Sequence, residues 1–169
     1  SVFHIDYESY NVSARYLSYL LTPATVCLAV PLYQQLSLLK KHARAILAGT
    51  VTGVLTTMAT VLVLALLFQL THEQYVTFLP KSITTAIGMG VSEEMGGIVT
   101  ITVACIIITG IIGNIIAETV CRLFHITEPV AKGIAIGSAS HAIGTTKAME
   151  MGEIEGAMSS LAIAVSGLC

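Results

Sequence analysis

The stretch GSASHAIGTTKAMEMGE, residues 137–153, places a histidine, a lysine, two glutamates and several hydroxyl side chains among glycines. It lies between segments that are apolar enough to sit in lipid. Glycine allows the backbone to leave a helix, and irregular backbone is tolerated at membrane depth only where protein or a water-filled cavity satisfies its polar groups. We therefore interpret this stretch as a broken segment that lines a cavity in a membrane protein.

The composition of the whole chain supports that interpretation. Of the 169 residues, 54% are hydrophobic and 11% are charged, whereas soluble domains are about 25% charged. We therefore expect the chain to be integral to a lipid bilayer. The net charge of -2 and the lack of a basic run argue against nucleic acid as a partner. The four cysteines show no metal-binding spacing, so we interpret them as packing residues. Because no constellation of metal ligands or of a nucleophile is visible either, we predict no metal, no cofactor and no catalytic residues.

Two stretches are long enough to cross a membrane as single helices. Residues 45–70 carry no charge and would extend about 39 Å as a helix, against a hydrocarbon core of roughly 30 Å. Residues 97–120 would extend about 36 Å and carry Asn114 and Glu118 near one end. We predict that both stretches span the membrane.

The two ends of the chain are less regular. Residues 15–39 are apolar but contain Pro23 and Pro31, so we predict a broken helix there. Residues 156–169 would extend only about 21 Å as a helix, which is too short to span. We expect residues 1–169 to form a single transmembrane domain, and to be a fragment that lacks N-terminal spans and the end of the last span.

An internal repeat is the most informative feature of the sequence. Residues 82–98 and 138–154, offset by 56 positions, are identical at 8 of 17 positions. A weaker third copy begins at Pro23. Each copy is Gly-, Ser- and Thr-rich, and such paired broken segments at repeated positions indicate the binding site of a transporter. Close packing through small residues is the alternative explanation, and it accounts well for Gly110 and Gly113.

The distribution of basic residues favours one topology for the repeated segments. If residues 81–97 form a re-entrant hairpin, five basic residues share one side of the membrane and Lys81 is alone on the other, which is the positive-inside pattern. These five are Lys40, Lys41, Arg44, Arg122 and Lys132. Successive hairpins would then meet from opposite faces near the midplane. We predict an all-α integral membrane protein with transmembrane helices and broken or re-entrant Gly-rich segments that form pseudo-inverted repeats; a full crossing of 81–97 and 133–153 is the alternative.

Two quoted motifs carry a family resemblance that covers essentially the whole chain. TPATVCLAVPLYQQ (22–35) and GIAIGSASHAIGTTKAMEMGEIEGAMSSLAIAVSG (133–167) resemble the LrgB/CidB family of bacterial membrane proteins, which has a plastid glycolate/glycerate translocator as its plant relative. The resemblance implies a multi-pass protein of the bacterial inner (plasma) membrane. It also implies a small LrgA/CidA-type membrane subunit as a partner, and we expect a homo-oligomer.

The resemblance implies two functions of different classes. One is secondary transport of small organic monocarboxylates such as glycolate, glycerate or pyruvate, with proton coupling as a further hypothesis. The other is a holin/antiholin-like pore or regulatory membrane subunit that controls murein hydrolases and lysis. We predict transport as the main function and keep the second as the alternative. An intramembrane hydrolase is a distant third, because His141 has no evident activated nucleophile beside it.

The hydroxyl groups of both repeat copies are our candidate substrate-binding residues. A small carboxylate in a cavity needs hydrogen-bond donors and a positive end, which hydroxyls and the N-termini of half-helices supply. The alternative is that each hydroxyl bonds a carbonyl of its own helix. The predicted hydroxyl residues are Ser82, Thr84, Thr85, Ser138, Ser140, Thr145 and Thr146.

Four ionisable residues complete the predicted site. His141 is a candidate substrate ligand and proton carrier, because histidine titrates near neutral pH and is costly within a membrane. Lys147 either binds the carboxylate or pairs with Glu150 one turn away. Glu94 and Glu150 occupy matching positions of the repeat and are candidates for proton coupling, with solvation at a hairpin end as the alternative.

Overall fold

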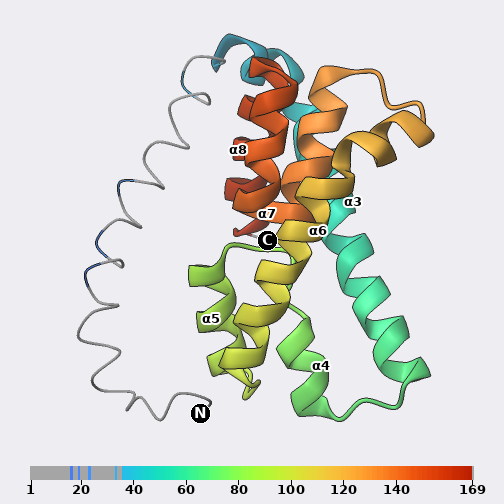
Figure 1. The fold of residues 1–169 in the computed structure, drawn as a ribbon, viewed down its shortest axis with the longest axis vertical. Helices are drawn as coiled ribbons and strands as arrows, with labels where there is room; N and C mark the ends of the chain where they lie inside the picture. Colours follow the sequence, from blue (N-terminus) through green and yellow to red (C-terminus); the bar gives the residue numbers. More distant parts are fainter. Residues whose placement is uncertain (1–15, 17–18, 20–22, 24–32, 34–35, 169) are drawn as a thin grey trace.

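The computed structural model describes residues 36–168 together with residues 16, 19, 23 and 33 (Figure 1). The predicted broken helix at 15–39 and the third repeat copy, which begins at Pro23, fall mostly outside these residues. The described part is entirely helical. Its elements are α3 (Leu36–Leu67), α4 (His72–Phe78), α5 (Thr85–Glu94), α6 (Val99–Leu123), α7 (Pro129–Met151) and α8 (Glu153–Ser166).

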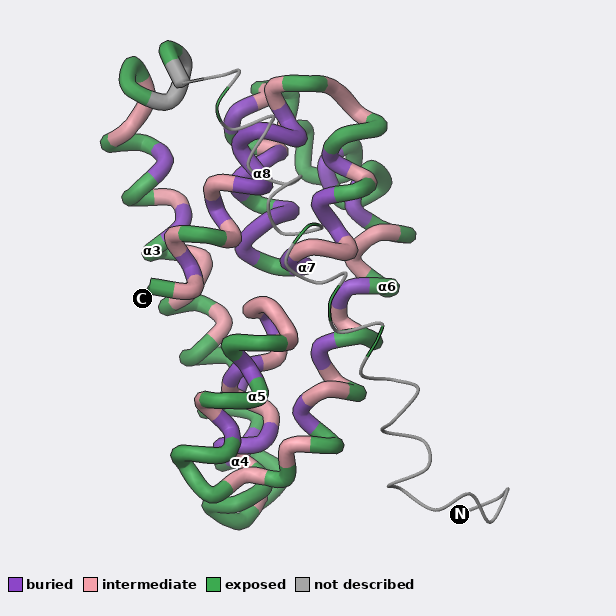
Figure 2. The backbone as a smooth tube through the Cα atoms, turned by 90° about the vertical axis from the view of Figure 1, so that its left-hand side faces the viewer, coloured by how far each residue is buried: buried purple, intermediate pink, exposed green. Residues whose placement is uncertain are grey.

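Helices α3 and α6 match the two predicted spans. Lys40–Leu67 and Val99–Leu123 are long and apolar enough to cross a membrane, and only 17% of each apolar window is buried. Figure 2 shows the large exposed share of both helices. The core helix of a soluble protein would instead be mostly covered, so this exposure agrees with a lipid-facing surface. Helix α3 ends before the predicted residue 70 because Gln69 adopts a positive φ of 52°.

Helix α7 is interrupted at one residue. His141 has φ 43° and ψ -141°, a non-helical conformation, and it separates a first arm, residues 129–140, from a second arm, residues 142–151. The first arm runs toward the beginning of α6: Ile136 packs in one cluster with Ala117, whereas His141 reaches Ile106. The first arm and α6 are therefore antiparallel.

The second arm runs in the opposite direction. Ile143 lies against Gly110 of α6, and Lys147, one turn later, lies 3.7 Å from Glu118 of α6. Contacts therefore move toward the end of α6 as the chain proceeds. The chain reverses at His141, and we call the two arms together the α7 hairpin.

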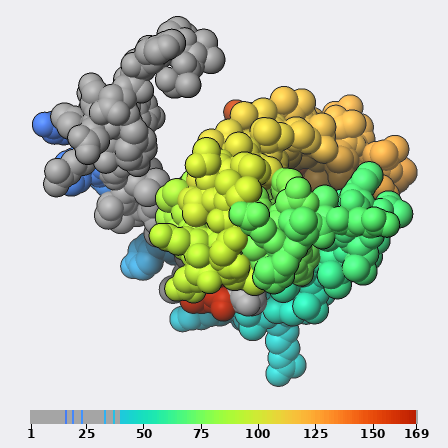
Figure 3. All heavy atoms as spheres, turned by 90° about the horizontal axis from the view of Figure 1, so that it is seen from below, coloured from blue at the N-terminus to red at the C-terminus, as the bar shows by residue number. Residues whose placement is uncertain are grey.

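A second reversal joins α4 to α5, and we call residues 72–94 the α4–α5 hairpin. Thr71 caps α4 in a reciprocal capping box with Gln74. Along α5, Gly88 lies against Ile106, and Ser92 bonds Thr102 at 2.7 Å. Helix α5 therefore runs toward the beginning of α6. Figure 3 shows α4 and α5 lying over this end of the molecule, with α3 along one side.

The two repeat copies form corresponding elements. An offset of 56 residues places α5 (Thr85–Glu94) on residues 141–150, which make up the break and nearly all of the second arm of α7. Both copies contain a chain reversal followed by a short helix. Because α5 runs toward the beginning of α6 and the second arm runs toward its end, the two helices have opposite directions along the same span.

Helix α8 and small residues hold the α7 hairpin in place. Gly133 and Gly137 of the first arm face the backbone of α8 so closely that neither has room for a Cβ. The side chain of Ser140 occupies the space that a Cβ at Gly113 of α6 would need. The apolar core joins α3, the first arm and α8, and consists of Ile46, Val130, Ile134, Ala157, Met158 and Ala162.

Candidate functional site

His141 lies at the reversal of the α7 hairpin and is held by the backbone of α6. The residue is 2% exposed, and its Nε2 lies 2.8 Å from the carbonyl oxygen of Ile106. A carbonyl only accepts hydrogen bonds, so Nε2 carries a proton and donates it. The carbonyl of His141 in turn accepts a 2.9 Å bond from Thr145 Oγ1. This geometry gives the side chain an anchoring role, and its predicted role in substrate binding stays a prediction.

The predicted hydroxyls of the second arm also serve the fold. Thr145 is fully buried and shares a 2.7 Å hydrogen bond with Ser159 of α8. Thr146 donates to the carbonyl of Ile143 and accepts from Asn114 Nδ2 at 2.9 Å. These bonds attach the second arm to α8 on one side and to α6 on the other.

The turn of the α4–α5 hairpin presents three of the predicted hydroxyl residues. Ser82 is buried, and its Oγ accepts a 3.0 Å hydrogen bond from Lys81 Nζ. Thr84 is the N-cap of α5, but its side chain makes no capping bond. The first N–H groups of α5, beginning at Thr85, are therefore left without a side-chain partner at this turn.

A small cavity joins the two hairpins. Its volume is about 40 Å³, and it contains Ser82 from one hairpin, Ser138 from the other and Ser166 from the end of α8. Apolar side chains of α3 and of the α4–α5 turn, together with Thr57, complete the lining. Ser138 donates to Ile134 O at 2.8 Å, so its proton is already engaged. Ser140, the neighbouring prediction, is buried and packs beside Gly113.

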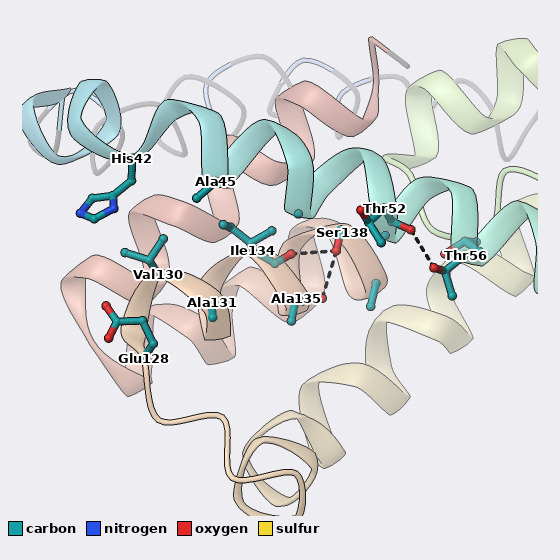
Figure 4. A pocket seen from close by; sticks show the side chains of 14 residues that line it. His42, Ala45, Thr52, Thr56, Glu128, Val130, Ala131, Ile134, Ala135 and Ser138 are labelled. Carbon is teal, nitrogen blue, oxygen red and sulfur yellow. Dashed lines mark hydrogen bonds between the residues drawn. The ribbon is translucent and has the colours of Figure 1, made fainter.

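A larger groove of about 690 Å³ lies between α3 and the first arm of α7 (Figure 4). His42 and Glu128 lie at one end, and Ser138 lies farther along with the threonines of α3. Thr56 and Ser138 bond carbonyls of their own helices. The surface of the groove is consequently mostly apolar, and it brings together none of the other predicted site residues.

The predicted charged residues lie at the bases of the hairpins. Lys147 makes ion pairs with Glu150 at 3.1 Å and with Glu118 at 3.7 Å. Glu94 is exposed at the end of α5. Lys147 lies six residues after His141, about 9 Å along the helix. Its ammonium is therefore paired with carboxylates at a distance from the reversal.

Sequence reasoning missed three polar residues of this region. From the sequence, Lys81 stands at the start of a predicted hairpin over 81–97 and is used only to assign topology, whereas the structure places it at the turn of the α4–α5 hairpin, residues 72–94. Asn114 donates 2.9 Å hydrogen bonds to both Ile143 O and Thr146 Oγ1, whereas the sequence shows it only as a polar residue near the end of a span. Ser166 lies in an apolar stretch, and nothing in its neighbourhood distinguishes it.

Comparison with known proteins decides the family. The model of the LrgB-like family matches residues 1–169. The chain belongs to the LrgB-like family. The resemblance inferred from the motifs at 22–35 and 133–167 is therefore confirmed.

Relatives of this LrgB-like chain include three proteins from Bacillus. It is 38% identical over 162 residues to the uncharacterized protein YxaC of Bacillus subtilis (strain 168), covering 96% of this chain and 70% of the relative. It is 36% identical over 165 residues to proteins named antiholin-like protein LrgB in Bacillus mycoides (strain KBAB4) and Bacillus cereus (strain B4264), covering 98% of this chain and 72% of each. No solved structure matches the chain.

Proposed function

We propose that both hairpins are re-entrant and enter the membrane from opposite faces. Helix α5 has 10 residues and would extend about 15 Å, and the longer first arm of α7 would extend about 18 Å, so neither spans a core of roughly 30 Å. The α7 reversal contacts Ile106, and Gly88, in the first turn of α5, lies against the same residue. Ile106 is about 10 Å from one end of α6 and about 25 Å from the other. The opposite directions of α5 and the second arm support a pseudo-inverted repeat in a multi-pass protein of the bacterial inner membrane.

We further propose that this architecture serves secondary transport of a small organic monocarboxylate such as glycolate, glycerate or pyruvate. The observation that carries the proposal is the cavity where buried hydroxyls of both hairpins meet, Ser82 from one and Ser138 from the other. A site between two opposed hairpins can open to either face by their relative movement. Proton coupling through His141, Glu94 and Glu150 is the further part of this proposal.

The second candidate is an antiholin-like membrane subunit that regulates murein hydrolases and lysis. Its support is the name that two of the three relatives above carry, antiholin-like protein LrgB. The comparisons favour this function more directly than transport, because none of those relatives is named a transporter. The two candidates are compatible if carboxylate movement is the means of regulation. A small LrgA/CidA-type subunit and self-association belong to both proposals.

Uptake by the intact protein in proteoliposomes tests the transport proposal. Labelled glycolate and pyruvate are offered with and without a pH gradient, and labelled sucrose measures leakage. Saturable uptake of either acid, inhibited by the other, without sucrose entry supports a carrier. Sucrose entry at the same rate as the acids contradicts it and favours a pore. A change in the initial rate of uptake with the pH gradient supports proton coupling. An unchanged rate contradicts proton coupling but leaves the transport proposal in place.

A further inference from the structure

We propose that Lys81 supplies the positive charge for the carboxylate of the transported acid, and that the hydroxyls of Ser82 and Ser166 donate hydrogen bonds to it. This inference rests on the proposed transport function. It adds a charge partner and a hydroxyl from a third element, α8, to the meeting point of the two hairpins.

The first observation is the position of the Lys81 ammonium, which does not line the small cavity itself but contacts Ser82, a residue that does. Lys81 is partly buried at the turn of the α4–α5 hairpin, and its Nζ donates a 3.0 Å bond to Ser82 Oγ. Within the described residues, no carboxylate oxygen lies within 4.0 Å of this Nζ, whereas Lys147 has two such neighbours. Removing an ammonium from water without a counter-ion is unfavourable. An anion bound beside Lys81 would therefore be stabilised.

The second observation is independent of the lysine. Ser166 is 5% exposed, lines the small cavity, and its Oγ has no hydrogen-bond partner. Buried hydroxyls are nearly always bonded, so an unpartnered one on a cavity indicates a missing ligand or water. Thr50 also lacks a partner, but it lines neither the small cavity nor the groove.

The hydroxyl protons that remain free at the cavity favour an anionic ligand. Ser82 accepts from Lys81, so its own proton is free for a ligand, and the proton of Ser166 is free as well. A carboxylate has acceptors only, and therefore complements these donors. The N-terminus of α5 begins at the same turn, where Thr84 provides no side-chain cap, and it adds a positive partial charge. The Lys81 charge and this helix end both disfavour a metal cation.

The size of the cavity limits the ligand. A volume of about 40 Å³ holds roughly a few water molecules, which is comparable to one carboxylate group with little beyond it. The apolar remainder of the lining, which includes Val54, Met58, Leu79 and Ile83, offers no second charged partner. The cavity thus fits the head of a short monocarboxylate better than a dicarboxylate.

Equilibrium binding of labelled glycolate to the purified intact protein tests the inference, with its neutral analogue glycolamide as competitor. Lys81→Met should weaken glycolate binding by about tenfold or more, because it removes a charge-assisted hydrogen bond. Wild type should prefer glycolate to glycolamide, and Lys81→Met should lose that preference. Lys81→Arg should retain part of it. Lys132→Met removes a lysine of the first arm whose side chain makes no hydrogen bond to a residue of the cavity; it is the matched control and should bind as wild type does.

Ser166→Ala is a second variant that tests the same inference if Lys81→Met does not fold. Removing an unpartnered buried hydroxyl should not lower the thermal stability of the ligand-free protein, yet glycolate binding should weaken about threefold to tenfold. If wild type binds and transports glycolate while both variants bind it with unchanged affinity and preference, the inference is overturned and transport stands. If wild type neither binds nor transports any of glycolate, glycerate and pyruvate, the proposed function fails and the inference fails with it.

Discussion

The two hairpins arise from copies of one repeated sequence but are packed differently. Eleven residues of the α7 hairpin are buried, whereas six residues of the equally long α4–α5 hairpin are buried: Val76, Thr77, Pro80, Ser82, Gly88 and Ser92. The α7 hairpin lies between α6 and α8, and its reversal is bonded to the backbone of α6. The α4–α5 hairpin contacts chiefly α6 and turns over several residues. From this comparison we expect the α4–α5 hairpin to be the more mobile of the two, and to be the one that moves in the transport proposed above.

Matched glycine substitutions should give the largest difference between the hairpins. Gly137→Ala should destabilise the protein by about 2–3 kcal/mol, because the new Cβ would overlap the backbone of Ser159. Gly90→Ala, in α5, meets no atom within 4 Å and should be neutral or stabilising by up to about 1 kcal/mol. Thermal unfolding in detergent measures both. Equal effects would mean that the two hairpins are packed alike.

At position 141, a glycine variant should be more stable than an alanine variant, which is the reverse of the usual order within a helix. His141→Ala loses the bond to Ile106 but keeps a backbone with φ 43°, whereas His141→Gly loses the same bond and removes the strain. We expect the glycine variant to be more stable than the alanine variant by about 1–2 kcal/mol, although alanine is favoured within ordinary helices. Greater stability of the alanine variant would contradict the chain reversal. Glycolate uptake by the stable glycine variant shows whether the imidazole itself is needed.

Hydrogen exchange should distinguish the hairpins in the unmodified protein. Amides in the second arm of α7 should exchange about tenfold more slowly than those of α5, because exchange requires local opening and the second arm is the more deeply buried. Peptide-resolved exchange in detergent or nanodiscs provides the comparison. Faster exchange in the second arm would show that the mobile element has been misassigned.

The smallest effect is expected at the base of the α7 hairpin. The side chains of Glu118 and Glu150 are 51% and 68% exposed, so their ion pairs with Lys147 are screened by water. Lys147→Gln should leave the unfolding temperature and the KM for glycolate unchanged within error. A large rise in the KM for glycolate would show that Lys147 takes part in substrate binding.

The sequence allowed the spans and the repeat to be predicted, because both depend on local patterns. Two long apolar stretches lie in α3 and α6, and the offset of 56 residues pairs α5 with the break and second arm of α7. Prediction of the site was less complete. Lys147 and Glu150 lie in the same motif as His141, but the helix after the break carries them toward its base.

The missed residues depend on contacts that no local pattern records. Ser166 reaches the cavity because α8 packs along α7 through Gly133 and Gly137, and only the assembled fold brings it beside Ser82. Asn114 becomes important because it faces the carbonyl of Ile143. Lys81 was visible in the sequence, but its significance depends on its bond to Ser82 and its partial burial.

Labelling of single cysteines with a membrane-impermeant maleimide tests the central claim most directly, after the four native cysteines of the intact protein are replaced by alanine. Glu128→Cys and Glu153→Cys flank the α7 hairpin, and His72→Cys and Glu94→Cys flank the α4–α5 hairpin. We predict that Glu128→Cys and Glu153→Cys are labelled from one face and that His72→Cys and Glu94→Cys are labelled from the other. Labelling of the two members of either pair from opposite faces would show that the segment crosses the membrane, and the account of two opposed re-entrant hairpins would be wrong.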